Sequence, residues 1–226
     1  MTQHAQGTAE WHAERAGRFT ASGFSLVNLF TVGEGEYKSG PKKGQPKIAT
    51  PLKGRTDYIR RLLAERLTGK SREQVQAKSL TWGHDIEPLA RAMYQARTGV
   101  IVELCGFIVH PQYDFIGASP DFLVGKDGGG EIKSPMSTEV HLETLEEGLP
   151  REHVDQIQGG LWVTGRKWWD FVSYHDDFPA HLKLYVERVE RDEAFIAKLE
   201  ANCLSAEAEI QARLAKLTTI EQKEAA

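Results

Sequence analysis

The segment at residues 115–135, FIGASPDFLVGKDGGGEIKSP, combines a strand-like apolar texture with two acids and a lysine. Side chains alternate across a strand, so Glu131 and Lys133 point to the same face. We expect the KDGG tetrapeptide to form a tight turn that brings Asp121 within one or two positions of Glu131 across the hairpin. The two carboxylates then repel each other unless a cation lies between them.

Hard oxygen ligands of this kind suit Mg²⁺ or Mn²⁺ better than zinc. Lys133 would not bind such an ion. Its amine would orient or deprotonate a water molecule and offset negative charge on a phosphate. The alternative is a plain exposed hairpin with a lysine–glutamate pair across its strands. Apolar neighbours such as Phe115 and Phe122 favour the first interpretation, and Glu87 adds a third acid on a helix upstream.

The rest of the pattern predicts the elements that must position these residues. Helical spacing of apolar residues predicts helices at residues 24–30, 56–68, 79–97 and 138–164, the last of them broken at 148–150. Strands are expected at residues 100–110, 115–125, 131–135, 168–175 and 182–190. Near-heptad apolar spacing predicts an amphipathic C-terminal helix at residues 190–226 that packs on the body or on a neighbouring subunit. The sequence therefore predicts one α/β domain over residues 1–226, with a central mixed β-sheet flanked by helices.

Charge is distributed unevenly along the chain. The net charge is −4, yet residues 38–61 hold eight basic side chains against one acid. Residues 31–55 are rich in glycine, proline and lysine, which predicts a long basic loop able to touch a nucleic-acid backbone. Two cysteines provide neither a disulfide framework nor the ligands of an iron–sulfur cluster. The chain shows no apolar run long enough to span a membrane and no signal-peptide pattern at its start, so we expect a cytoplasmic protein.

An ordered set of motifs resembles the PD-(D/E)xK nuclease superfamily and, within it, the lambda-type phage exonucleases, also called the viral recombinase exonuclease family. The motifs are WHAERAGRFTAS at 11–22, TWGHDIEPLARAMYQARTG at 81–99, GASPDFLV at 117–124, EIKSP at 131–135 and HVDQIQGGLWVTGRKWWDFVSY at 153–174. They cover most of the chain; the loop at 31–54 and the tail beyond about residue 190 match only loosely. The resemblance implies a restriction-endonuclease-like core.

The resemblance also implies a chemistry: digestion of linear duplex DNA from 5′ ends with two Mg²⁺ or Mn²⁺ ions. Asp121, Glu131 and the main-chain carbonyl of Ile132 would bind metal, and Glu87 would complete the surroundings of the second ion. Lys133 would position and activate the attacking water.

A second set of residues would recognise the end of the DNA. Arg15 can hold two phosphate oxygens with its forked guanidinium. Ser22 is expected to cap the helix that follows it. By resemblance, Arg15, Ser22, Ser119 and Gln158 would bind the terminal 5′-phosphate, and Lys42 and Lys43 of the basic loop would contact the backbone. Gln156 and Gln158 lie two apart on a helix, so only one can face the site, and the resemblance favours Gln158.

The family further implies a phage or prophage protein of the bacterial cytoplasm, a ring-shaped homotrimer around the duplex, and a cognate single-strand annealing protein as partner. Two alternatives stay open. One is an endonuclease or junction resolvase of the same superfamily. The other is a non-catalytic module that binds DNA ends, although such a binder gains nothing from acids placed near phosphate.

Overall fold

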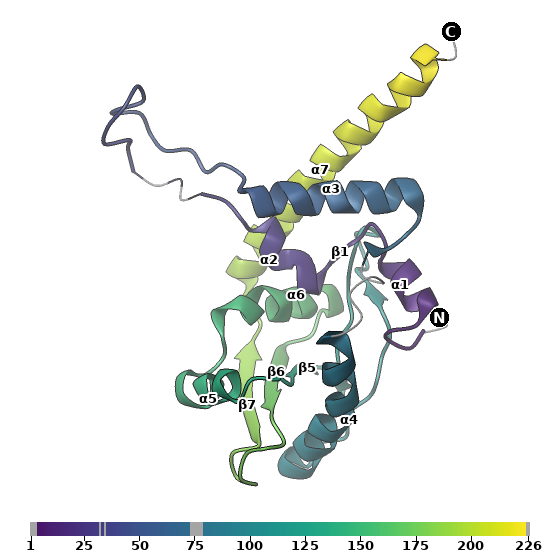
Figure 1. Ribbon diagram of the computed structural model, residues 1–226, viewed down its shortest axis with the longest axis vertical. Helices are drawn as coiled ribbons and strands as arrows, with labels where there is room; N and C mark the ends of the chain where they lie inside the picture. The colour runs from purple at the N-terminus through teal and green to yellow at the C-terminus, as the bar shows by residue number, and fades with distance from the viewer. Residues whose placement is uncertain (1–3, 32, 34, 73–78, 225–226) are drawn as a thin grey trace.

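The computed structural model describes residues 4–31, 33, 35–72 and 79–224, and its centre is a four-stranded sheet (Figure 1). The strand order is β4(Phe122–Val124), β5(Gly128–Lys133), β6(Trp168–Tyr174), β7(Leu184–Glu190). The β5–β6 pair is parallel and the other two pairs are antiparallel. The crossover between the parallel strands contains α5(Thr138–Glu147), the short 3₁₀ turn η3(Arg151–His153) and α6(Val154–Thr164). This mixed sheet confirms the predicted fold class.

The alternation of side chains along these strands divides the interior into two apolar clusters. Trp169 and Phe171 lie in the cluster formed with α6 and the C-terminal helix. Val172 and Tyr174 lie in the other cluster, together with residues of α4(Ser79–Thr98). Helices therefore cover both faces of the sheet, as strands of this apolar character require. α4 continues through Pro88.

A second, smaller sheet lies beside the first and has the order β1(Phe19–Thr20), β3(Ile116–Ala118), β2(Ile108–Val109). Two sequence expectations are corrected here. Residues 115–125 are two strands in different sheets, because Pro120 has no N–H with which to continue a ladder. Of residues 100–110, only Ile108–Val109 form a strand, and Glu103 adds an isolated bridge to Leu123.

The three consecutive glycines of the hairpin lie in the strand and not in the turn. The turn is formed by residues 125–127, where Gly125 has φ +51°, and Gly128, Gly129 and Gly130 belong to β5. A Cβ atom on Gly130 would lie 1.9 Å from the Phe122 ring. At Gly128 it would lie 2.1 Å from the Trp168 ring. The expected KDGG turn is therefore wrong: β5 lacks side chains there because aromatic rings occupy the space.

The helices near the N-terminal half mostly agree with expectation. α3(Lys53–Thr68) ends at Gly69, which has φ +66°, and α4 ends one residue before Gly99. The helix expected at 24–30 is the single turn α2(Phe24–Val27), after the 3₁₀ turn η1(Ala21–Gly23). Its N-cap is Gly23 without a side-chain hydrogen bond, so the prediction that Ser22 caps it is wrong.

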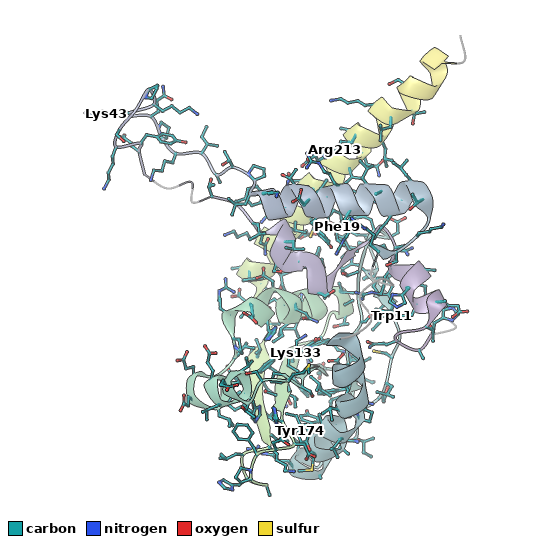
Figure 2. The ribbon with its side chains drawn as sticks, in the orientation of Figure 1. Trp11, Phe19, Lys43, Lys133, Tyr174 and Arg213 are labelled. Carbon is teal, nitrogen blue, oxygen red and sulfur yellow. The ribbon has the colours of Figure 1, made fainter. Side chains whose placement is uncertain are left out.

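Two segments extend from the body (Figure 1). The C-terminal helix α7(Glu193–Glu224) buries Ile196, Leu199 and Ile210 against the core, but its last turns continue past α3 and Leu217 is 38% exposed. On the other side residues 35–52, here called the basic arm, carry Lys43 near the tip (Figure 2). The loop predicted at 31–55 is thus shorter, because α3 begins at Lys53. Across the described residues, no helix is long and apolar enough to cross a membrane.

Candidate active site

The two acids of the hairpin lie side by side. Phe122 pairs with Gly130, which makes Asp121 and Glu131 neighbours at the next position along the ladder. The amide of Asp121 donates to the carbonyl of Gly130 (3.2 Å), and Oδ2 of Asp121 accepts from the amide of Ile132 (2.6 Å). The expected register is therefore confirmed, and the carboxylate of Asp121 is fixed against the strand that carries Glu131.

The electrostatics of this pair fit a bound cation. Burial and the nearby charges of Glu131 and Glu87 hold the pKa of Asp121 well above its usual range. A divalent ion would remove that repulsion, and carboxylate oxygens are the donors that Mg²⁺ and Mn²⁺ prefer. In the part of the chain that the structure describes, no three acid, histidine or cysteine side chains form a ready-made metal cage. Glu87 lies in its own ion pair with Arg91, so the fit to the ion rests on the donor chemistry of Asp121 and Glu131.

Lys133 and Gln156 hold the second acid. Glu131 is buried, and its Oε1 accepts from Lys133 Nζ (2.8 Å) and from Gln156 Nε2 (2.5 Å). Lys133 also donates to the Gln156 side-chain oxygen (3.2 Å). Burial lowers the pKa of Lys133, but the charges of Glu131 and Asp121 raise it more, so its net pKa lies above the ordinary lysine value. Lys133 is consequently an ammonium group at neutral pH.

The choice between the two glutamines is corrected by these contacts. Gln158 is buried, donates to the carbonyl of Glu190 (2.9 Å) and accepts from the amide of Asp192 (2.9 Å). Its amide therefore joins α6 to the chain between β7 and α7. Gln156, two residues earlier and on the other side of the helix, faces the acids. Helical spacing predicts that only one of the two glutamines can face the acids. The packing of α6 determines that this residue is Gln156.

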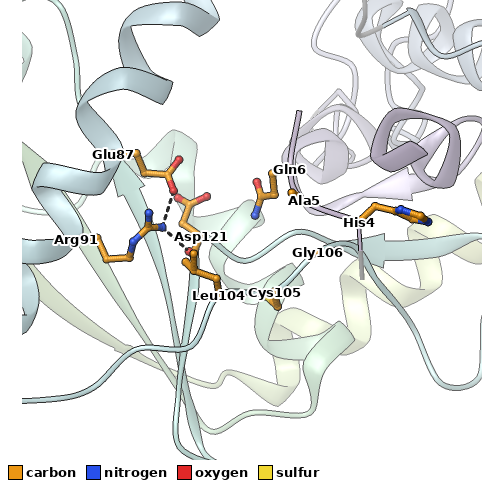
Figure 3. A pocket seen from close by; sticks show the side chains of 9 residues that line it. All are labelled: His4, Ala5, Gln6, Glu87, Arg91, Leu104, Cys105, Gly106 and Asp121. Atoms are coloured by element: carbon orange, nitrogen blue, oxygen red, sulfur yellow. Dashed lines mark hydrogen bonds and ion pairs between the residues drawn. The ribbon is translucent and has the colours of Figure 1, made fainter. Parts of the chain in front are cut away.

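Glu87 reaches the site from α4. It pairs with Arg91, one turn later, through Arg91 Nη1 and Glu87 Oε1 at 2.9 Å. Together with Asp121 they line an open pocket of about 380 Å³, whose other walls are His4, Ala5, Gln6, Leu104, Cys105 and Gly106 (Figure 3). Glu87 from α4 and Asp121, which directly precedes β4, therefore line one side of a cavity that a substrate can enter, and Glu131 lies beside Asp121 on β5.

A cluster of phosphate-binding character lies next to the acids. Arg15 is buried, and its two terminal nitrogens donate to Ser119 Oγ (3.1 Å) and Ser22 Oγ (3.3 Å). Its guanidinium stacks 4.2 Å from the Trp11 ring centroid, and Trp11 Nε1 also donates to Ser119 Oγ (3.0 Å). The structure thus brings together three of the four residues expected at the 5′-phosphate, two positions along the chain from Asp121.

The two lysines expected to contact the DNA backbone lie outside this cluster. Lys42 and Lys43 are exposed on the basic arm, away from the acids (Figure 2).

Three residues of the site were not predicted, namely Gln156, Arg91 and Trp11. The i, i+4 spacing of Glu87 and Arg91 on a helix was a usable signal for Arg91. No comparable signal in one sequence selects Trp11 or Gln156.

Comparisons with known proteins identify the family and the fold of the chain. Residues 45–167 match the YqaJ-like viral recombinase domain. An alkaline exonuclease from Laribacter hongkongensis is 37% identical, with a TM-score of 0.81 over 96% of this chain and 99% of that one. The same enzyme in complex with dAMP is also similar, at 36% identity over the same shares of the two chains and with a TM-score of 0.81.

A phage-related exonuclease from Haemophilus somnus 129PT is 14% identical, with a TM-score of 0.67 over 88% of this chain and 96% of that one, and supports the fold alone. No curated protein sequence matches the chain. The expected resemblance and the restriction-endonuclease-like fold are confirmed, and the chain belongs to the YqaJ-like viral recombinase family.

Proposed function

We propose that the protein is a metal-dependent exodeoxyribonuclease that degrades one strand of linear duplex DNA in the 5′→3′ direction. It begins at 5′-phosphorylated ends and leaves 3′ single-stranded overhangs for recombination by strand annealing. The observation that carries this proposal is the distance along the chain between two clusters. Ser119, which accepts from Arg15, and Asp121, which faces Glu131, flank a single proline. A phosphate held at the first cluster therefore lies close to the acids of the second.

Asp121, Glu131 and Glu87 would hold two Mg²⁺ or Mn²⁺ ions. The carbonyl of Ile132 is a further ligand candidate, because a residue in a strand directs its carbonyl and its N–H to the same edge, and the Ile132 N–H points at Asp121. When bound, the ions would stabilise the attacking and leaving oxygens of an in-line displacement.

Lys133 would orient the attacking water and offset negative charge on the phosphate. The charges of Glu131 and Asp121 raise the pKa of Lys133 and keep its amine protonated. As long as no cation neutralises these two acids, the amine donates hydrogen bonds and cannot accept a proton. Gln156 keeps the ammonium beside Glu131. This arrangement favours water positioning over general-base catalysis by the lysine.

Arg15 would bind the terminal phosphate. Its buried guanidinium presents a forked donor between two serine hydroxyls, and a phosphate oxygen can replace either hydroxyl as acceptor. Burial of the Arg15 side chain lowers the local dielectric, which strengthens charge-assisted hydrogen bonds. Lys42 and Lys43 on the basic arm would contact the DNA backbone without reading its sequence.

Resemblance to the family supports a proposal for the biological setting. We propose linear double-stranded DNA as substrate, a homotrimeric ring that encloses the duplex, and a cognate single-strand annealing protein that receives the 3′ strand. The enzyme would work in the cytoplasm of a bacterial host, encoded by a phage or prophage.

Digestion of linear and of covalently closed circular DNA tests the proposal. The wild type should degrade linear duplex with Mg²⁺, stop when a chelator is added, and leave the circle intact. Asp121→Ala should lose activity, whereas Asp127→Ala, in the turn of the same hairpin, should keep it. Cleavage of the circle would favour an endonuclease or junction resolvase. Binding of DNA ends without digestion would favour the non-catalytic module.

A further inference from the structure

Arg91 connects the helix that carries Glu87 to the strand that carries Asp121. Its Nη1 donates to Glu87 Oε1 at 2.9 Å and to the main-chain carbonyl of Asp121 at 3.4 Å (Figure 3). The first contact follows from the i, i+4 spacing on α4. The second joins residues 30 apart in sequence. One guanidinium thus ties together the two elements that supply these acids.

This contact differs from an ordinary surface ion pair. The side chains of Arg91 and Glu87 are only 16% and 25% exposed, and both line the pocket beside Asp121. Partial burial makes charge-assisted hydrogen bonds stronger and more geometrically restrictive than exposed pairs. Pro88 lies between the two residues and lacks an N–H, which removes one main-chain hydrogen bond from this part of α4. The Arg91–Glu87 ion pair therefore contributes more to holding this part of α4 in place.

The acids around Asp121 are balanced by two internal cations. Lys133 donates to Glu131 from the strand side, and Arg91 donates to Glu87 from the helix side. Asp121 lies between them and accepts from the amide of Ile132. Arg91 pairs with Glu87 as Lys133 pairs with Glu131. Arg91 also donates a hydrogen bond to the main-chain carbonyl of Asp121.

We propose that Arg91 is a positioning residue, which holds the Glu87 carboxylate and the Asp121 backbone in the relative placement that the reaction requires. This inference rests on the proposed nuclease function and extends it. The Nη1 atom is engaged with two protein acceptors, and through these contacts Arg91 acts on Glu87 and Asp121. Misplacement of a reacting group by about 1 Å is enough to reduce a rate by about 100-fold.

The test compares Arg91→Gln with Arg91→Lys and with a matched control, Arg97→Gln. Arg97 is on the same helix and also donates to a main-chain carbonyl, that of Leu184, but it does not line the pocket. We expect Arg91→Gln to lower kcat for 5′-phosphorylated duplex by about 10- to 100-fold with little change in KM. Arg91→Lys should recover part of kcat, and Arg97→Gln should keep it.

Calorimetric titration of the metal-free proteins with Mn²⁺ provides a second readout. The substitution removes a positive charge near the acids, so Arg91→Gln should bind Mn²⁺ at least as tightly as the wild type. Its kcat should nevertheless stay low at saturating Mn²⁺. An unchanged kcat, full recovery at saturating metal, or a loss confined to KM would overturn the proposal while the wild type stays active. An inactive wild type would instead overturn the nuclease function, and this inference with it.

Discussion

At the scale of single residues, Asp121 carries the least favourable charge of the site. It is half-buried, and desolvation together with the charges of Glu131 and Glu87 raises its pKa. Its acceptor contact with the amide of Ile132 offsets only part of that cost. Such a residue is held in place by the fold at the expense of stability, as is common for groups that act on a substrate.

The pH dependence of stability should reveal this cost. A carboxyl group whose pKa is raised in the folded state does not affect stability below its ordinary range near pH 4, and destabilises the fold increasingly as pH rises through the raised pKa. We expect metal-free Asp121→Asn to exceed the wild type by about 1 kcal/mol in free energy of unfolding at pH 8, and the difference to vanish at acidic pH. Urea unfolding in chelator at several pH values measures it; a difference that is largest at pH 4 would contradict the account.

Much of the site at this scale could be predicted from the sequence. Asp121, Glu131 and Lys133 meet because strand alternation and a short hairpin leave few other arrangements. Arg15 and Ser119 meet through a long-range contact that residue pattern alone does not determine, and the resemblance to a family supplied it. Gln158 was preferred to Gln156 wrongly, because the rotation of α6 about its axis depends on how its apolar face packs.

At the scale of elements, β5 begins with glycines, and this lets neighbouring aromatic rings pack directly against its backbone. That close packing fixes the hairpin in which Asp121 lies beside Glu131. Phe122 and Trp168 fill the space that side chains on Gly130 and Gly128 would need. The ring of Phe122 belongs to the cluster that α4 covers, so the same packing that shapes the hairpin also places the helix of Glu87. The glycine run therefore reflects close packing and not a flexible turn.

Gly130→Ala should accordingly destabilise the protein. The new Cβ would overlap the Phe122 ring, and overpacking of a core costs about 1–3 kcal/mol in free energy of unfolding. Gly130→Ala combined with Phe122→Leu should recover part of that loss, which a double-mutant cycle in urea detects. Additive losses in the two single variants would show that the ring and the strand are not coupled.

Elements with strong local signals were predicted well, and those defined by tertiary contacts were not. The ends of α3 and α4 follow from Gly69 and Gly99. The division of residues 115–125 between two sheets depends on strands far away in sequence, β1 and β5. Ser22 resembled a helix cap but instead accepts from Arg15.

At the scale of the whole molecule, the net charge of −4 conceals a basic projection. The basic arm extends from the body (Figure 1), and its Lys38, Lys42 and Lys43 are exposed. The middle of α7 is joined to α3 by ion pairs, including a bidentate contact between Arg66 and Glu207, and its last turns form the second extension. Composition predicted the basic loop and apolar spacing predicted the C-terminal helix, but the projection of both from the body required the folded structure.

The salt dependence of DNA binding tests the arm. Each lost phosphate contact lowers the slope of log K against log salt by about 0.9. Lys42→Ala with Lys43→Ala should therefore reduce the slope by about 2 and weaken binding equally for unrelated sequences. Lys167→Ala is the control, because Lys167 pairs with Asp127 at the end of the β5–β6 pair opposite Lys133. An unchanged slope in the double variant would remove the arm from the DNA interface.

The central claim is that a phosphate-binding cluster delivers a 5′ end to the acids, and a duplex with one phosphorylated 5′ end tests it most directly. The two strands carry different labels, and the products are followed with time in Mg²⁺. We predict that the phosphorylated strand is lost from its 5′ end while its complement persists as an intact single strand, and that Arg15→Gln abolishes the preference for that end. Shortening from 3′ ends, or an unchanged preference in Arg15→Gln, would contradict the account.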